Sequence, residues 1–119
     1  MSKIVRLERR ARSSKVVIYN GIVYLGGNTA EDRTLDIQGQ TAQVLASIDR
    51  RLRDAGTDKS RLLTAQIWLK EVHRDWKGMN EVWDAWTDPE NAPTRATGQV
   101  ELAHPDILVE IVVTAAAGE

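Results

Sequence analysis

Two charged side chains suited to binding or acid–base chemistry stand in strand-like, apolar surroundings. Arg95 lies near the start of the run Pro93–Leu102, and Glu110 is the lone carboxylate of the extended run Leu108–Ala115. A guanidinium is permanently charged and can hold a carboxylate or phosphate through two parallel hydrogen bonds. An unpaired charge inside a packed sheet costs several kcal/mol. We therefore expect Arg95 to pair with a protein acid or with an anionic ligand.

Strand geometry indicates whether Glu110 can be that partner. Side-chain alternation places Arg95 and Thr97 on one face of their strand. If the two runs form a hairpin with Leu102 near Leu108, Arg95 and Glu110 are about five residues apart, on the order of 16 Å at the rise of a strand. They then cannot pair within one subunit. Two interpretations stay open: a structural ion pair between subunits, and a ligand bound by Arg95.

Composition limits the classes of function. At 119 residues, the chain 1–119 is expected to form a single domain. Its 16 basic and 17 acidic residues give a net charge of −1, so we expect neither nucleic acid nor a membrane as a partner. The absence of cysteine excludes disulfides and thiolate sites, and no metal motif is found. No long apolar run or signal-like N-terminus is present, which favours a cytoplasmic protein.

The pattern of elements predicts an α+β fold. Asn20-Gly21 between two β-branched runs is typical of a hairpin turn, and apolar spacing predicts a helix over Asp36–Ala55 that ends at Gly56. A second helix is expected over Arg74–Trp86. The expected strands lie at Ile4–Leu7, Lys15–Asn20, Ile22–Leu25, Arg61–Lys70 and the two runs around Arg95 and Glu110. Six strands and two helices form a mixed sheet with both helices on one face, and the bare face favours a homo-oligomer.

Other candidate residues fit structural roles better than catalytic ones. The second helix carries large side chains at helical spacing, namely Trp76, Met79, Trp83 and Trp86. We interpret this stripe as core packing against the sheet rather than as an aromatic ligand site. His73 and His104 stand beside turn or helix-start residues, which favours surface or capping roles. No Ser-His-Asp spacing or phosphate-binding glycine loop is found.

The residues around Arg95 resemble the C-terminal signature of the RidA/YjgF family. Pro93-Thr94-Arg95 is followed, fifteen residues after the arginine, by Glu110 in Val-Glu-Ile. The other matches span nearly the whole chain and comprise Asn20-Gly21, Gly26-Gly27, Gln40-Thr41, Ala55-Gly56, Leu69-Lys70, Met79-Asn80 and Trp83. Trp83–Trp86 and Ala11–Ser14 are closer to the YoaB-like branch of the family.

This resemblance implies a chorismate-mutase-like homotrimer with ligand clefts between adjacent subunits. Members of the family hydrolyse 2-imino acids to 2-keto acids and ammonia, without a metal or cofactor. By resemblance, Arg95 clamps the substrate carboxylate, and Glu110 positions or activates water as the catalytic residue. Thr97 donates a hydrogen bond, and the backbone near Gly26 and Gly27 completes the cleft.

The chain departs from the family pattern around this cleft. Ser13 stands where the archetype has an aromatic wall, Gly26 replaces a serine, and Thr97 replaces a cysteine. Arg12 either adds a second positive charge to the cleft or lies on the surface. The altered lining leaves the preferred substrate open.

We expect hydrolytic deamination of reactive 2-imino and enamine acids at an intersubunit cleft, with a small carboxylate-bearing substrate. The alternative is a non-catalytic trimer that binds small carboxylate metabolites in a regulatory role. This alternative function uses Arg95 in the same way and does not need Glu110. A ribonuclease function, attached to some family members, is disfavoured by the net charge of −1 and by the lack of paired histidines.

Overall fold

The N-terminal part of the sheet forms where short stretches of the sequence favour strands and a tight turn. The computed structural model describes residues 3–118, beginning with an antiparallel meander of three strands: β1 (Val5–Arg9), β2 (Ser14–Tyr19) and β3 (Ile22–Leu25). Asn20 and Gly21 take φ values of 50° and 78° between β2 and β3. Both angles are left-handed, as a tight two-residue hairpin turn requires. The predicted hairpin at Asn20-Gly21 is confirmed.

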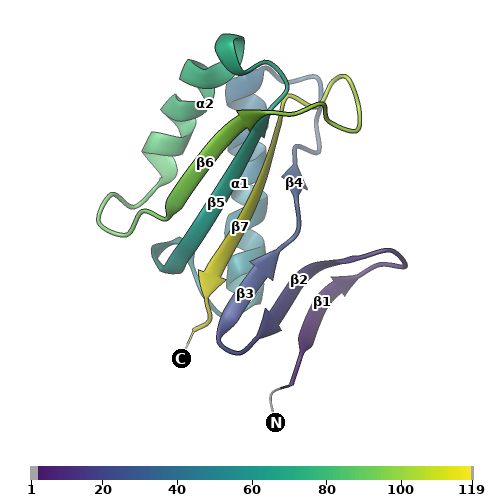
Figure 1. Ribbon diagram of the computed structural model, residues 1–119, viewed down its shortest axis with the longest axis vertical. Coiled ribbons are helices and arrows are strands. Elements are labelled where there is room, and N and C mark those ends of the chain that lie inside the picture. The colour runs from purple at the N-terminus through teal and green to yellow at the C-terminus, as the bar shows by residue number, and fades with distance from the viewer. Residues whose placement is uncertain (1–2, 119) are drawn as a thin grey trace.

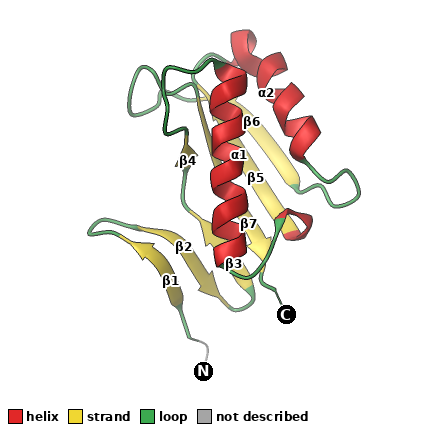
Figure 2. Cartoon of the chain, turned by 180° about the vertical axis from the view of Figure 1, so that it is seen from behind, coloured by secondary structure: helices red, strands yellow, loops and turns green. Residues whose placement is uncertain are grey.

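Two helices form where the apolar spacing predicts them. In α1 (Ile37–Asp54), the Asp36 side chain accepts a hydrogen bond from the Gly39 backbone at the N-terminal end. Gly56 follows the helix with φ 83°, a conformation that glycine adopts without a steric penalty. The second helix, α2 (Val72–Trp86), lies beside α1 on the same face of the sheet (Figure 2).

Within residues 3–118, the sheet is mixed and contains seven strands. Its remaining members are β4 (Asn28–Thr29), β5 (Leu62–Leu69), β6 (Thr94–Gln99) and β7 (Val109–Ala116), with a short 3-10 helix, η1 (Lys59–Arg61), leading into β5. The strand order is β1-β2-β3-β7-β5-β6, and β4 pairs with the free part of β7 (Figure 1). Among the strand pairs of the described residues, only β5 and β6 run parallel. The predicted mixed sheet with two helices on one face is confirmed, with β4 as a strand beyond the six expected.

The predicted pairing of the last two strands is wrong. β5 lies between β6 and β7, so those two strands form no hairpin (Figure 1). The reason is the βαβ unit β5-α2-β6, whose helical crossover brings two parallel strands together. β6 is therefore an edge strand, with Thr94, Ala96 and Gly98 exposed. The interpretation of Arg95 as a charge in an otherwise buried strand is wrong for the same reason.

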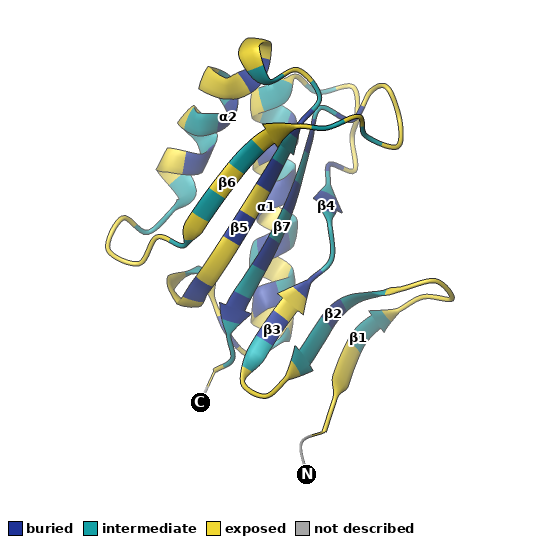
Figure 3. Ribbon diagram, viewed as in Figure 1, coloured by how far each residue is buried: buried dark blue, intermediate teal, exposed yellow. Residues whose placement is uncertain are grey.

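The core lies between the sheet and the two helices. Along β7, Val109, Ile111, Val113 and Ala115 are fully buried on the helix side. The intervening residues, including Glu110, face the uncovered side and are half-buried (Figure 3). No helix within residues 3–118 is both long and apolar enough to span a membrane.

One buried side chain of α1 positions the start of β7. The Gln40 amide donates hydrogen bonds to the carbonyls of Arg33, Leu35 and Asp106. Its oxygen accepts one from the backbone N–H of Leu108 at 3.0 Å. Because every polar atom of this buried amide is paired, the loop before β7 is held against α1. Glu110 follows two residues later.

Candidate active site

Arg95 projects from the edge strand β6 toward α2. Its Nη1 donates a hydrogen bond to Asn80 Oδ1 at 2.7 Å. The guanidinium carbon lies 5.4 Å from the ring centre of Trp76 and 5.6 Å from that of Trp83. At these distances, the faces of aromatic rings attract a cation. Residues three and four apart share one side of a helix, so α2 presents all three neighbours of Arg95 together.

The Arg95 guanidinium has no carboxylate partner within residues 3–118. The hydrogen bond to Asn80 uses one of its five N–H donors. The ion pairs of the described residues all involve other arginines. Burial lowers the pKa of Arg95, while the Asp84 carboxylate acts in the opposite direction. A guanidinium stays charged in proteins, so the remaining donors are available to an anion.

Thr97 lies beside Arg95 on the helix-facing side of β6. Register places Arg95 opposite Ala65 and Thr97 opposite Ile67, and both of these β5 residues belong to the core. The Thr97 Oγ1 is buried and has no hydrogen-bond partner in the described part of the chain. Leaving a buried hydroxyl unpaired costs about 1–3 kcal/mol.

The tryptophan stripe of α2 is only partly a core feature. Met79 and Trp83 are buried, but 46% of Trp76 is exposed, and its ring lies against Arg95. The core-packing interpretation is therefore wrong for Trp76. Sequence reasoning also missed Asn80 as a partner of Arg95. The available signal was the spacing of positions 76, 80 and 83 on one side of the helix.

Glu110 belongs to a second group of candidate residues. It faces the uncovered side of the sheet, and Gly27 passes directly over its carboxylate. A Cβ added to Gly27 would stand 1.9 Å from Glu110 Oε2 and 2.9 Å from its Cδ. Only glycine allows so close an approach. Within residues 3–118, the Glu110 side chain makes no hydrogen bond or ion pair, so its oxygens can accept protons from water or a ligand.

Gly26 precedes Gly27 and contacts the start of β2, whereas Ser13 and Arg12 make no hydrogen bond with Glu110 or Gly27 within residues 3–118. The Gly26 N–H donates to the Lys15 carbonyl at 2.9 Å. A Cβ at Gly26 would meet the Ser14 carbonyl oxygen at 3.6 Å, an ordinary contact. Ser13 is exposed, and its carbonyl accepts from the backbone N–H of Arg10 at 2.8 Å. Arg12 is exposed in the same loop.

Arg95 and Glu110 do not meet in one copy of the chain. Across the sheet, Arg95 aligns with Ala65 and Val113, whereas Glu110 aligns with Trp68. Three residues along the strands and two strand spacings separate the two positions by about 14 Å. Their side chains also lie on opposite faces of the sheet. The predicted separation within one subunit thus agrees with the structure, although it arises from the intervening β5 and not from a hairpin.

The described residues contain no group of three or more histidine, cysteine, aspartate or glutamate side chains that could hold a metal ion. The Arg95 group, which comprises Arg95, Asn80, Trp76, Trp83 and Thr97, offers a cation between aromatic rings. The Glu110 group offers a carboxylate beside the half-buried backbone of Gly26 and Gly27.

Comparisons with known proteins give a consistent result over nearly the full chain. The sequence profile of the family described as Endoribonuclease L-PSP matches residues 3–117. A RutC family protein of Haemophilus ducreyi is 46% identical over 113 residues, covering 95% of this chain and 96% of the relative. The RutC family protein YoaB of Escherichia coli is 42% identical over 113 residues, covering 95% and 97%.

A more distant relative, the 3-aminoacrylate deaminase RutC of Acinetobacter baylyi, is 31% identical over 100 residues, covering 84% of this chain and 78% of the relative. Among solved structures, a YjgF family protein of Neisseria meningitidis has a TM-score of 0.95 at 38% identity, covering 98% of this chain and 97% of that chain. The fold is therefore the chorismate-mutase-like fold of these proteins. The chain belongs to the RidA/YjgF family.

Proposed function

We propose that this chain assembles as a homotrimer and hydrolyses reactive 2-imino or enamine acids to 2-keto acids and ammonia in clefts between subunits. The observation that carries the proposal is the Arg95 group. It contains a guanidinium that has no carboxylate partner within residues 3–118 and that lies between the rings of Trp76 and Trp83. A small acid bound through its carboxylate supplies the partner that Arg95 lacks. The name of the Acinetobacter relative, a 3-aminoacrylate deaminase, supports an enamine acid as the substrate class.

The separation of Arg95 and Glu110 supports placing the cleft between two copies of the chain. The two side chains leave one subunit on opposite faces of the sheet, so a small substrate reaches both only if a second copy supplies one of them. The uncovered face of the sheet, with 45% of Tyr24 exposed, is a surface on which copies can pack. Arg95 of one subunit then anchors the substrate carboxylate beside Glu110 of the next.

The proposed reaction requires little beyond positioning. Arg95 holds the substrate carboxylate, and Glu110 accepts a proton from a water molecule as its oxygen attacks the imine carbon. The imine nitrogen takes up a proton from solvent, which gives a tetrahedral carbinolamine. The carbinolamine hydroxyl then loses its proton to solvent as the carbon–nitrogen bond breaks, the protonated Glu110 returns its proton to the leaving nitrogen, and a 2-keto acid and ammonia remain. Orientation and general base catalysis are the contributions of the protein.

The anchoring step is tested by Arg95→Ala in an assay that forms imines in situ with an amino-acid oxidase and follows ammonia release. We expect kcat/KM to fall about 100-fold, the effect of losing a bidentate charge-assisted contact of about 3 kcal/mol. Arg6→Ala, which removes an exposed arginine of β1, is the matched control and should leave the rate unchanged. An Arg95→Ala variant as fast as wild type would refute the anchor.

The intersubunit cleft is tested by mixing two inactive variants, Arg95→Ala and Glu110→Gln, and refolding them together. In a randomly mixed trimer, about one quarter of the interfaces would join an intact Arg95 to an intact Glu110. Partial recovery of activity is therefore expected. If Arg95 and Glu110 of the same chain formed the site, every site would carry a defect and no activity would return.

The second candidate function is non-catalytic binding of small carboxylate metabolites. It is favoured because the Arg95 group can bind a carboxylate without Glu110. Glu110→Gln separates the two functions when binding of a 2-keto acid and turnover are measured on the same variant. Intact binding with lost turnover supports the deaminase. Binding of the 2-keto acid by the wild type, with no ammonia release above the uncatalysed rate, would support the non-catalytic binder.

A further inference from the structure

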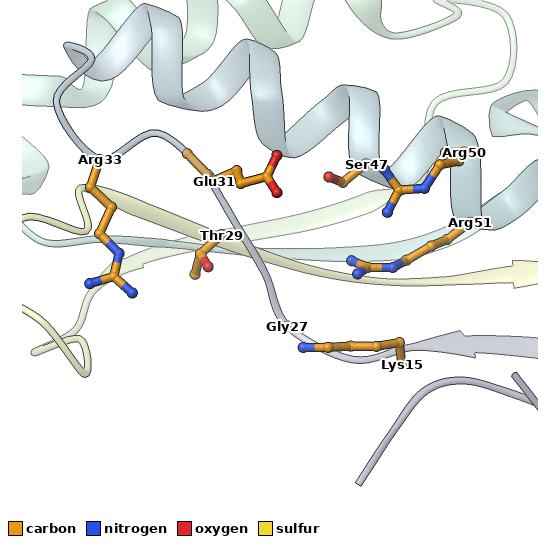
Figure 4. A pocket seen from close by; sticks show the side chains of 9 residues that line it. Lys15, Gly27, Thr29, Glu31, Arg33, Ser47, Arg50 and Arg51 are labelled. Atoms are coloured by element: carbon orange, nitrogen blue, oxygen red, sulfur yellow. The ribbon is translucent and has the colours of Figure 1, made fainter. Parts of the chain in front are cut away.

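A polar pocket of about 340 Å³ lies beside α1, where β2 and β4 diverge from each other (Figure 4). Its volume is within the range of sites for small molecules. Its lining residues come from β2, the link between β3 and β4, β4, the segment after β4 and the C-terminal half of α1: Lys15, Gly27, Thr29, Ala30, Glu31, Arg33, Ser47, Arg50 and Arg51. Four of these residues are cations and one is an anion, so the walls carry a formal charge of +3.

Two of the four cations are not neutralised by the protein. Within residues 3–118, neither Lys15 nor Arg50 makes a side-chain hydrogen bond or an ion pair. Arg33 faces Asp106 at 3.5 Å between two exposed side chains, a contact that contributes little. Figure 4 shows that the charged groups of Lys15, Arg50 and Arg51 point into the pocket, and that the side chains of Glu31 and Ser47 face it. Positive groups held together without counter-charges repel one another, and an anion between them relieves that repulsion.

Arg51 is held rigidly at the inner wall of the pocket. Its Nη1 donates to the buried Asn28 Oδ1 at 2.5 Å, and its Nε donates to Glu8 Oε2 at 3.1 Å. Only 12% of the Arg51 side chain is exposed. The hydrogen bond from Arg51 lowers the pKa of Glu8, and the charges of Arg50 and Arg10 act in the same direction. One carboxylate thus orients Arg51 and offsets only part of the positive charge.

We propose that this pocket binds the phosphate group of a small metabolite. A planar carboxylate is satisfied by one arginine fork, whereas a phosphate accepts hydrogen bonds on several oxygens and from several directions. Here the side-chain donors come from two sides of the pocket: Lys15 from β2, and Ser47, Arg50 and Arg51 from α1. The Glu31 carboxylate repels a phosphate at its own end of the pocket and accepts hydrogen bonds. It therefore favours a ligand whose remainder carries hydroxyl or amino groups.

This inference does not depend on the deaminase function. The pocket and Glu110 share Gly27, which contacts the Glu110 carboxylate and also lines the pocket. The pocket residues come from one copy of the chain. Phosphate binding can therefore be measured whether or not the protein releases ammonia from imines.

The test uses the full-length chain and follows backbone amide signals by NMR during titration with glycerol 3-phosphate, a phosphate monoester with hydroxyl groups. We expect shifts at the amides of Gly27, Thr29 and Ser47, and an affinity that falls as salt is added. Arg50→Gln and Lys15→Gln should each weaken binding about tenfold, the effect of one charge-assisted hydrogen bond. Lys77→Gln, which removes an exposed lysine of α2 outside the pocket, should leave the affinity unchanged.

Thermal unfolding of the same variants tests whether weaker phosphate binding results from a loss of folded protein. Because Arg50 is exposed and has both the Glu8 carboxylate and other cations near it, its replacement should leave Tm nearly unchanged. Absence of amide shifts at about 10 mM ligand, a concentration that detects millimolar binding, would overturn the proposal. Equal affinities of Arg50→Gln and Lys77→Gln would do the same. Tighter binding of succinate than of glycerol 3-phosphate would refute the assignment to phosphate.

Discussion

The close contact between Gly27 and Glu110 predicts that a methyl group at position 27 impairs catalysis much more than folding. In Gly27→Ala, the new Cβ would stand 1.9 Å from Glu110 Oε2, whereas real Cβ contacts lie above 3.0 Å. The carboxylate must therefore move by about 1 Å or more. Oε2 is the end of a flexible side chain, so a change of rotamer accommodates the methyl group at a cost of about 0.5–1.5 kcal/mol.

Catalysis is expected to respond more strongly than stability. A misplacement of about 1 Å in a reacting group can cost on the order of 100-fold in rate. We therefore expect kcat for ammonia release from imines to fall by about that factor, with a loss of unfolding free energy of no more than about 1.5 kcal/mol. Substrate anchoring through Arg95 is untouched in this variant, so KM should change little.

Gly26→Ala is the matched control. Its Cβ would meet only backbone atoms, at 3.6 Å and beyond, and neither Gly26 nor Gly27 has the left-handed φ that excludes alanine. The control should keep wild-type activity and stability. Wild-type kcat in Gly27→Ala would show that the position of Glu110 does not matter for turnover. Unfolding of Gly27→Ala would show that the contact is structural and refute the reasoning from side-chain flexibility.

Two further predictions concern residues that orient these groups. Asn80→Ala removes the acceptor of Arg95 Nη1, so KM should rise about tenfold with a smaller change in kcat. Asn80→Asp should raise KM further because its carboxylate competes with the substrate for the guanidinium. An unchanged KM in both variants would exclude Asn80 as a positioning residue. The hydrogen bond from Arg51 lowers the pKa of Glu8 from its ordinary 4.5, so this pair stabilises the fold fully above that value and loses its effect as pH falls through the lowered one. The Tm difference between wild type and Glu8→Gln should therefore be larger at about pH 7 than at about pH 3, and an equal difference at both would contradict the ion pair.

Much of the fold could be predicted because its signals are local. Asn20-Gly21 specifies a left-handed turn, and therefore a hairpin, within a few residues. The apolar spacing of α1 and the stop at Gly56 are likewise properties of neighbouring residues. The alternation of residues along β7 places Glu110 on the opposite face from Val109 and Ile111, which are buried. Each of these features depends on backbone preferences or on burial of one face.

The pairing of β6 could not be read from its own residues. Thr94–Gln99 is compatible with an edge or a central strand, and the short spacing to β7 suggested a hairpin. The missed signal was the order strand-helix-strand over β5, α2 and β6, which favours a parallel crossover. That error hid the contact between Arg95 and α2, and it hid the exposure of Trp76. Asn80 entered the sequence argument only as a family match for the same reason.

By itself, the sequence determined which side chains have chemistry to offer: a permanently charged arginine, a lone carboxylate in an apolar strand, and glycines in a turn. Only the tertiary structure decided which of them meet. It brought Asn80, Trp76 and Trp83 to Arg95, placed Gly27 over Glu110, and gathered Lys15, Arg50 and Arg51 around one pocket. The physical reason is that residue type sets charge and hydrogen-bonding capacity locally, whereas proximity depends on strand order and helix packing, which are settled between segments distant in the chain.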